Sequence, residues 1–228
     1  MLPRMTQCIL IINPNTSCAC TDGIRAAVEP FNAPGLPRID VTQLADDQGV
    51  PAIVTWRDWF SVAEPLCRRI EAEAADAYVI GCVSDPGLEA ARTATDRPVL
   101  GMFRCAVAAA LTRAERFGII GFTWRSLPRQ RRALQSMGAD GQMAGWIPLD
   151  LPMEVLTDPL APQSRIAEAA RQLAAQGAET IILGCAGMAR HADVAAEASG
   201  LPVIEPAQAA AAAAQLAVIG ARAPVLSA

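Results

Sequence analysis

The chain has 228 residues, of which 52% are hydrophobic, and its mean hydropathy is +0.26. This apolar content excludes an intrinsically disordered protein and is enough for one large α/β domain or two small ones that share an interface. The formal net charge is −4 and the pI is about 5.1, a balance that does not favour nucleic acid or an anionic membrane as partner.

Neither end of the chain predicts a targeting or membrane segment. Residues 1–5 carry one arginine and lead into a short aliphatic run without the longer apolar segment and cleavage site of a signal peptide. Residues 206–224 are rich in alanine and interrupted by polar side chains, so they predict a packed helix rather than a membrane span. We therefore expect a cytoplasmic protein with no membrane partner.

Short aliphatic and β-branched runs alternate along the chain with longer segments whose apolar residues recur at helical intervals, as in 56–75 and 164–176. This alternation predicts an α/β fold in which parallel strands are joined by crossover helices. The six clearest strands are expected at residues 8–12, 78–80, 99–101, 118–120, 180–183 and 203–204.

Two stretches of the chain match each other. The run Tyr-Val-Ile-Gly leads into Cys82, and the run Ile-Ile-Leu-Gly leads into Cys185. Pro98 follows the first cysteine by 16 positions and Pro202 follows the second by 17, and each proline begins a short strand. The expected strand at 8–12 corresponds more loosely to the one at 118–120. These matches indicate an internal duplication of about half the chain.

The duplication predicts two pseudo-symmetric lobes, each a small parallel sheet flanked by helices. We place the first lobe at residues 1–103 and the second at 104–206, with residues 207–228 packing back on the first. Ligands of such sheets bind beyond the carboxyl ends of the strands. Four segments follow strands directly, and we expect them to meet in a cleft between the lobes: 13–17, 82–87, 121–125 and 185–188.

Cys82 and Cys185 occupy equivalent strand-to-helix turns. Free backbone N–H groups and a helix dipole stabilise a thiolate there, so the pKa of a cysteine, about 8.5 in isolation, is expected to fall towards neutrality. A thiol and a thiolate on opposite faces of a carbon could remove its proton and return one from the other side, while backbone N–H groups hold the enolate oxygen. The pattern therefore predicts a proton-transfer pair.

The remaining cysteines, the single histidine and the one basic cluster are expected to have structural roles. The seven cysteines are odd in number and lack Cys-x-x-Cys spacing, so neither a disulfide framework nor a metal site is expected. His191 is expected at the surface or an interface. The arginines within 125–132 predict a solvated helix face, or a carboxylate contact near its start.

Three motifs resemble the hydantoin and allantoin racemases of the aspartate/glutamate racemase superfamily. They are Ile-Asn-Pro-Asn-Thr-Ser at 12–17, Gly-Cys-Val-Ser-Asp-Pro-Gly-Leu at 81–88 and Leu-Gly-Cys-Ala-Gly-Met-Ala at 183–189. The similarity spans nearly the whole chain in the family's order. It implies a two-lobed, cofactor-independent racemase that moves a proton at an activated carbon, with a 5-substituted hydantoin or related amino-acid derivative as substrate.

The resemblance assigns the acid/base pair to Cys82 and Cys185, and it suggests a homo-oligomer. It also implies that the small-molecule substrate is contacted by Asn13, Asn15, Thr16, Val83, Ser84, Thr123, Ala186 and Gly187. Two of these assignments have structural alternatives. The two asparagines can serve the turn around Pro14, and the threonine at position 123 can cap a helix.

The chain departs from the family pattern at three places, which leaves the substrate open. Val83 stands where hydantoin racemases commonly have an aromatic residue. The helix start at 101–105 lacks the usual acidic residue, and Phe122 and Trp124 occupy positions where small or hydroxyl residues are common.

Other functions therefore remain open. One is a maleate cis-trans isomerase, which also keeps two cysteines. Another superfamily enzyme is possible, such as an amino-acid racemase or a decarboxylase, although decarboxylation on this scaffold relies on one cysteine and the pair argues against it. The third is a non-catalytic small-molecule-binding module, in which replacing either cysteine with serine would leave binding intact.

Overall fold

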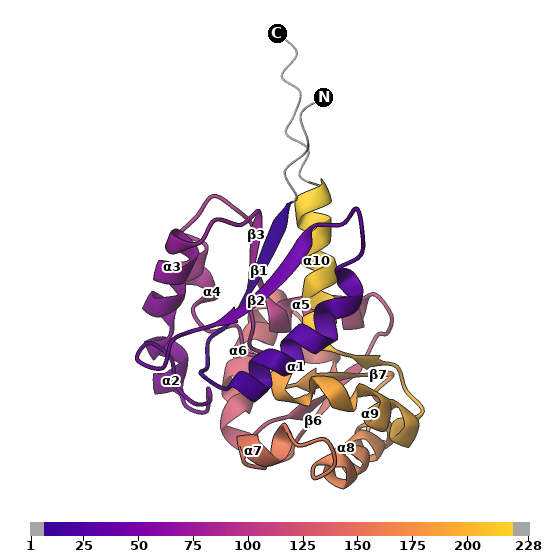
Figure 1. Ribbon diagram of the computed structural model, residues 1–228. Helices are drawn as coiled ribbons and strands as arrows, with labels where there is room; N and C mark the ends of the chain where they lie inside the picture. The colour runs from indigo at the N-terminus through magenta and orange to yellow at the C-terminus, as the bar shows by residue number, and fades with distance from the viewer. Residues whose placement is uncertain (1–6, 221–228) are drawn as a thin grey trace.

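The computed structural model describes residues 7–220, and its strands form two four-stranded parallel sheets (Figure 1). The first sheet has the order β2-β1-β3-β4 and the second has the order β6-β5-β7-β8, so the two halves share one topology. This confirms the α/β, two-lobed fold expected from the duplication. The strands are β1 Cys8–Asn13, β2 Arg38–Gln43, β3 Ala77–Ile80, β4 Val99–Gly101, β5 Phe117–Gly121, β6 Met143–Pro148, β7 Thr180–Gly184 and β8 Val203–Ile204.

The six strands expected from the sequence are present, and two more lie at equivalent edges of the sheets. β2 and β6 each pair with one neighbour only, and most of their residues are partly exposed. The sequence of β2 mixes apolar with charged and polar residues, and β6 contains Gly145 and ends at Pro148. Because an edge strand is half solvated, it lacks the continuous aliphatic run that identifies a central strand.

Helices connect the strands in the expected alternation. The helix expected at 56–75 is divided at Val62, because Pro65 in the first turn of the second segment has no N–H to donate and its ring opposes a continuous helix. The α-helices are α1 Cys18–Val28, α2 Trp56–Ser61, α3 Ala63–Ala72, α4 Leu88–Ala91, α5 Met102–Leu111, α6 Leu127–Met137, α7 Met153–Leu156, α8 Gln163–Ala175, α9 Ala192–Ser199 and α10 Pro206–Gly220. The 3₁₀ segments are η1 Glu29–Phe31, η2 Trp124–Ser126, η3 Asp140–Gln142 and η4 Ala186–His191.

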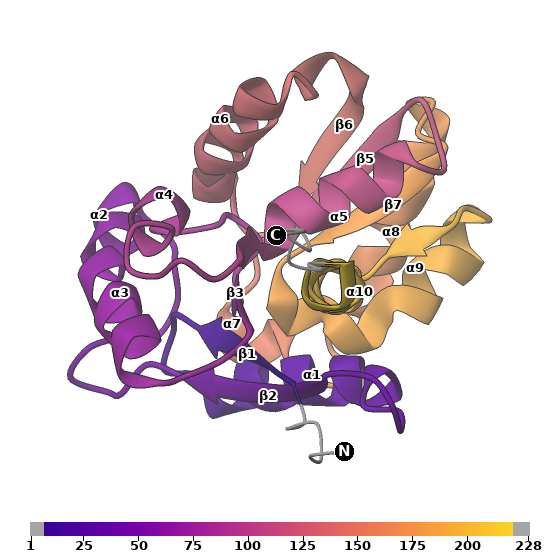
Figure 2. The ribbon, with the colours of Figure 1, turned by 90° about the horizontal axis from the view of Figure 1, so that it is seen from above.

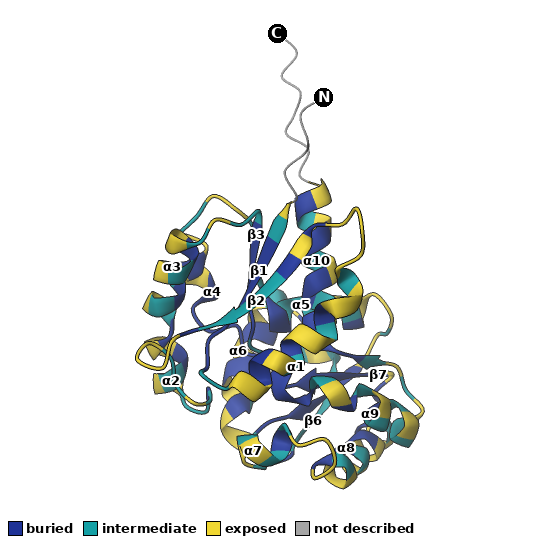
Figure 3. Ribbon diagram, viewed as in Figure 1, coloured by how far each residue is buried: buried dark blue, intermediate teal, exposed yellow. Residues whose placement is uncertain are grey.

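One apolar core joins the two sheets, and a separate core lies on the outer face of each. The central core contains Ile11 from the first sheet, Ile119 from the second and Phe103 from α5. In Figure 2, α10 is seen end on between α1 and α5, and Figure 3 shows the central strands buried. Because both lobes contribute to this core, the carboxyl ends of the two sheets are held facing each other.

The last helix packs on both the first lobe and α5, as Figure 1 also shows. Gln215 Nε2 donates to the carbonyl of Phe31 at 2.8 Å, and Gln208 Nε2 donates to the carbonyl of Ala27 at 3.3 Å. Residues 221–228 of this expected packing segment lie outside the described residues. The expected lobe boundary after residue 103 falls inside α5, so it stays a prediction. Between residues 7 and 220, every helix is too short or too polar to cross a bilayer.

Candidate active site

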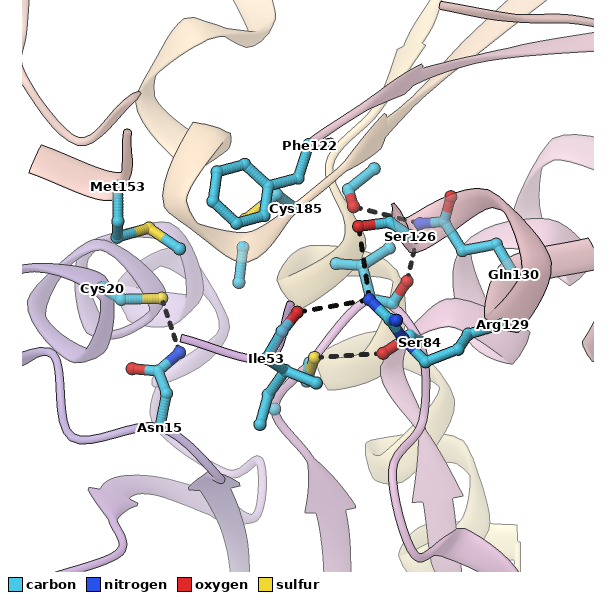
Figure 4. A pocket seen from close by; sticks show the side chains of 15 residues that line it. Asn15, Cys20, Ile53, Ser84, Phe122, Ser126, Arg129, Gln130, Met153 and Cys185 are labelled. Carbon is cyan, nitrogen blue, oxygen red and sulfur yellow. Dashed lines mark hydrogen bonds between the residues drawn. The ribbon is translucent and has the colours of Figure 1, made fainter. Parts of the chain in front are cut away.

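A cavity of about 30 Å³ lies where the carboxyl ends of the central strands of the two sheets face each other (Figure 4). All four segments expected to meet there contribute, with Asn15, Cys82, Phe122 and Cys185 among the lining residues. Eight further residues that line the cavity lie outside the four expected segments: Cys20, Ile53, Gly81, Ser126, Arg129, Gln130, Met153 and Gly184. The fold therefore brings the two matched cysteines into the wall of one cavity.

Cys82 lies on the turn after β3, with its Sγ 3.5 Å from the hydroxyl oxygen of Ser84. Burial raises the pKa of this thiol, whereas the Ser84 hydroxyl and the Arg129 guanidinium favour the thiolate and oppose that rise. The nearest helix, α4, begins six residues further along the chain and has a single turn. The helix dipole expected to lower this pKa is therefore weak here.

Cys185 directly precedes η4 and has the backbone geometry of an N-cap residue. Burial raises its pKa well above the ordinary value, and the neighbouring thiols of Cys20 and Cys82 raise it further. The backbone N–H of Gly187 favours the thiolate but does not offset the burial. The expectation that both thiols are acidified is thus wrong for this cavity, because desolvation of each thiol outweighs the turn's N–H groups.

The two asparagines of the first motif have different positions. Asn13 is fully buried behind the cavity, where its Nδ2 donates to Asn15 Oδ1 at 3.0 Å and to Thr21 Oγ1 at 2.9 Å. Asn15 lines the cavity, and its Oδ1 also accepts from the backbone N–H of Ser17 at 2.9 Å. These bonds direct the Asn15 amide NH₂ towards the cavity, where its one protein partner is Cys20 Sγ at 3.8 Å (Figure 4). Asn13 therefore has the turn-stabilising role rather than a position in the cavity wall.

The other expected contact residues divide between the cavity and a second hollow. Val83, Ser84 and Ala186 line the cavity. Thr16 and Thr123 instead line an outer groove of about 720 Å³, which shares Phe122 and Met153 with the cavity. Gly187 lies behind Cys185, where an added Cβ would be 3.3 Å from Met153 Sδ and 3.6 Å from the cysteine sulfur.

Thr123 does not cap a helix through its side chain. It occupies the N-cap position of η2, but its hydroxyl makes no capping hydrogen bond there. The Oγ1 atom is buried without a hydrogen-bond partner at the wall of the outer groove. A substrate group in the groove could supply that partner.

Arg129 is a cation that sequence reasoning placed on a solvated helix face, and that interpretation is wrong. Its side chain is buried, and its guanidinium donates to the carbonyl of Val54 at 2.9 Å and to that of Ile53 at 3.3 Å. It also donates to Arg125 O at 2.8 Å, so it ties α6 to the loop before α2. The sequence did not distinguish this buried arginine from its neighbours on the same helix, since the arginines at 131 and 132 are exposed.

A buried carboxylate attaches the Cys82 turn to α5. Asp85 has a left-handed backbone, with φ of 49°, and accepts from the N–H groups of Phe103 at 2.8 Å and Arg104 at 3.1 Å. Gly101 makes room for it, since an added Cβ there would lie 2.4 Å from the carboxyl carbon. Burial raises the pKa of Asp85 to about 7. This carboxylate therefore caps the start of α5.

The second lobe builds the same cap from a different position. Glu205 stands where Gly101 stands in the repeat, and its carboxylate accepts from the N–H groups of Ala207 at 3.1 Å and Gln208 at 2.7 Å. Burial raises its pKa to about 7 as well. In both lobes, the capped N–H groups are the second and third after the Gly101 or Glu205 position, so the two caps are equivalent in space.

His191 is buried rather than at the surface, which corrects the sequence expectation. It ends η4, its exposed fraction is 1%, and its Nε2 has no hydrogen-bond partner. Burial lowers its pKa, so it is a neutral residue of the core beneath η4. In the described part of the chain, no cluster of three or more His, Cys, Asp or Glu side chains is arranged to hold a metal ion.

Comparisons with known proteins agree with this fold and site. The family model of the Asp/Glu/Hydantoin racemase family matches residues 9–214. A hydantoin racemase of Paenarthrobacter aurescens is 33% identical over 89% of this chain and 87% of its own length. A hydantoin racemase of Pseudomonas sp. strain NS671 is 34% identical over 86% of this chain and 80% of its own length.

Among solved structures, an allantoin racemase from Klebsiella pneumoniae is similar, with a TM-score of 0.84 and 32% identity over 94% of this chain and 89% of that chain. The chain therefore belongs to the Asp/Glu/hydantoin racemase family and is an isomerase of the racemase class. The resemblance inferred from the three sequence motifs is confirmed.

Proposed function

We propose that this protein racemises a 5-substituted hydantoin or a related amino-acid derivative, with Cys82 and Cys185 as the acid/base pair. The observation that carries the proposal is the presence of both thiols, from equivalent turns of the two lobes, in the wall of one cavity. Racemisation requires a base on one face of a carbon and an acid on the other, and a pseudo-symmetric cleft supplies that arrangement.

The chemistry is a balanced proton transfer. One cysteine thiolate takes the proton from C5 of the ring, and the C5–H electron pair moves into the adjacent carbonyl to form an enolate. The thiol of the other cysteine then protonates C5 on the opposite face as the enolate electrons return to carbon. The ring leaves inverted, and the two sulfurs have exchanged their protonation states, so the opposite enantiomer can use the reverse sequence.

Three polar side chains support these steps. Ser84 and Arg129 favour the Cys82 thiolate, which makes this cysteine the stronger candidate for the base in the resting enzyme. The Asn15 amide is fixed with its NH₂ towards the cavity, so it can donate to a ring carbonyl and stabilise the enolate oxygen. The amides of a hydantoin ring can pair with the neutral donors and acceptors of Asn15 and Ser84.

The dimensions of the site favour a substrate with an apolar substituent at C5. A cavity of about 30 Å³ holds roughly one water molecule, so the wall must open to admit a ring. Phe122 and Met153 separate the cavity from the outer groove. We assign the ring to the cavity and the C5 substituent to the groove, whose walls include Val54, Leu151 and Pro152.

Incubation of single enantiomers in deuterated water tests the proposal. The panel contains 5-benzylhydantoin, 5-methylhydantoin, allantoin, free amino acids and maleate, and it is read by optical rotation and by deuterium incorporation. Racemisation of a hydantoin with uptake of one deuteron at C5 is expected. Turnover of maleate alone, or no exchange with any compound, contradicts the proposed function.

Serine variants test the roles of the cysteines. Cys82→Ser and Cys185→Ser should each abolish racemisation while retaining C5 exchange with one enantiomer only, and the retained enantiomer should differ between the two. Cys18→Ser is the matched control, because Cys18 is exposed and outside the cavity, and it should keep full activity. If both cysteine variants keep exchange with both enantiomers, the acid/base pair is refuted and a binding module is favoured.

Independence of cofactors, a cytoplasmic location and a homo-oligomeric state complete the proposal. Self-association is supported by apolar side chains on α5 and α10, since Leu111, Leu216 and Ile219 are 38%, 72% and 50% exposed. Activity that survives exhaustive dialysis against a chelator, and a size-exclusion volume larger than that of a monomer, are the expected results.

A further inference from the structure

Gln130 joins the two cysteine turns through one side-chain amide. Its Nε2 donates to the carbonyl of Val83 at 2.7 Å and to the carbonyl of Gly184 at 3.0 Å. Val83 directly follows Cys82, and Gly184 directly precedes Cys185. The side chain is 1% exposed and lies at the cavity wall (Figure 4). Both amide protons therefore form hydrogen bonds with backbone carbonyls next to the two cysteines, one in each lobe.

A third hydrogen bond fixes which way this amide points. Trp146 Nε1 donates to Gln130 Oε1 at 2.7 Å, so the oxygen and the NH₂ group cannot exchange places. The indole itself has little freedom, because it lies over Gly121, where an added Cβ would be only 2.0 Å from a ring carbon. Strand β6 thus fixes the position of the Trp146 indole, and the indole fixes the orientation of the Gln130 amide. The amide in turn holds both cysteine turns.

We propose that Gln130 is a positioning residue that sets the separation and alignment of Cys82 and Cys185. The proposal deepens the proposed function, since it gives a physical reason why two thiols on different lobes keep one spacing across a substrate. Gln130 makes contact with the backbone beside each thiol rather than with the sulfurs themselves. Its effect on turnover is transmitted through the cysteines.

The buried location explains why an amide suits this position. Two carbonyl oxygens face one nitrogen, and an amide NH₂ satisfies both without adding a charge beside the thiols. A side chain without donors would leave both carbonyls unpaired, and a carboxylic acid could serve only one of them. The position therefore requires a side chain with two hydrogen-bond donors on one atom.

Three variants separate positioning from stability. Gln130→Met preserves the length of the side chain and removes every hydrogen bond. Gln130→Glu keeps the acceptor for Trp146 and, when protonated, one donor. Gln215→Met is the matched control, because Gln215 is also a buried glutamine that donates to one distant carbonyl, at 2.8 Å, far from the cavity.

Steady-state kinetics on the substrate found by the panel is the first measurement. A misplacement of about 1 Å can slow a reaction by about 100-fold, so kcat of Gln130→Met should fall by about 10- to 100-fold while KM stays near the wild-type value. Gln130→Glu should be intermediate and should lose activity as pH rises, because its remaining donor is lost on ionisation. Gln215→Met should keep wild-type kcat and KM.

The second measurement does not depend on turnover. Alkylation by iodoacetamide, followed at each cysteine by peptide mass, should accelerate at Cys82 and Cys185 in Gln130→Met, with Cys18 as an unchanged internal reference. If the wild type fails to racemise anything, the proposed function fails, and the alkylation rates alone test the positioning. Circular dichroism and thermal unfolding identify a variant that does not fold, in which case Gln130→Glu supplies the comparison.

Two results would overturn the positioning role. One is a Gln130→Met protein, folded as the wild type is, with kcat and alkylation rates that match those of the Gln215→Met control. The other is a rise in KM with unchanged kcat, which would make Gln130 a substrate-binding residue instead.

Discussion

The two helix caps beside the site can be exchanged, because Asp85 and Glu205 place carboxylates at equivalent points from different chain positions. The variant pair Asp85→Gly with Gly101→Glu gives the first lobe the arrangement of the second. Glycine suits position 85, where φ is 49°, and position 101 has an ordinary extended backbone with φ of −93°. The glutamate introduced at position 101 should then accept from the N–H groups of Phe103 and Arg104.

The magnitudes follow from the hydrogen bonds. Asp85→Gly alone leaves two buried N–H groups without an acceptor, at about 1–3 kcal/mol each, and regains about 1 kcal/mol from relief of the left-handed backbone, a net loss of about 1–5 kcal/mol. Gly101→Glu alone forces a side chain against the Asp85 carboxylate and should cost about 1–3 kcal/mol. The double variant should recover most of the loss, with a coupling energy of at least about 2 kcal/mol.

Urea unfolding of the wild type, both single variants and the double variant gives this coupling directly. Gly141→Ala serves as a control for adding a side chain at a glycine, since nothing lies within 4 Å of its Cβ position. Additive losses, with no recovery in the double variant, would refute the equivalence of the caps. If the double variant recovers stability but not activity, the cap stabilises the fold without determining the alignment of the Cys82 turn.

Further predictions concern pH, charge and substrate size. Asp85 and Glu205 have folded-state pKa values of about 7, above those of the unfolded chain, so the folded state binds more protons and the urea midpoint should be lower at about pH 8 than at about pH 5. Arg129→Met removes a cation that lowers the pKa of Cys82, so the acid limb of the kcat/KM profile, already expected above the ordinary thiol range, should move to higher pH. Met153→Ala joins the cavity to the outer groove, so KM for 5-benzylhydantoin should fall relative to that for 5-methylhydantoin, and equal changes for both would count against that assignment.

The central fold was predictable because buried strands and repeated turns leave a strong local signal. The runs before Cys82 and Cys185 are continuous and aliphatic, and their repetition identified both the topology and the pair. β2 and β6 could not be identified in this way, because an edge strand has one solvated side and tolerates polar residues, glycine and proline.

Two of the residues missed at the site act over long sequence separations. Arg129 and Gln130 lie in the first turn of a helix whose pattern is that of an ordinary amphipathic surface, and their partners at Val54 and Val83 lie 75 and 47 residues away. The pKa expectation failed for a related reason. A turn beside a strand can be read from sequence, whereas exclusion of water from the cavity depends on side chains of both lobes. The contact between the glutamine at 130 and the tryptophan at 146 does not correspond to any sequence motif, so it could not be predicted from the sequence.

The position of both thiols in the wall of one small cavity has a consequence for the proposed catalytic cycle. In the mechanism proposed above, each inversion exchanges the protonation states of the two sulfurs, so the protein would end a turnover in a form competent only for the reverse direction. Returning to the starting form requires a proton to pass from one sulfur to the other, directly or through solvent. Ser84 and Arg129 favour the thiolate at Cys82, whereas the Cys20 thiol disfavours it at Cys185, so the two forms are not equivalent. At high substrate concentration the two directions should therefore saturate differently, although the overall equilibrium constant between enantiomers is fixed by symmetry.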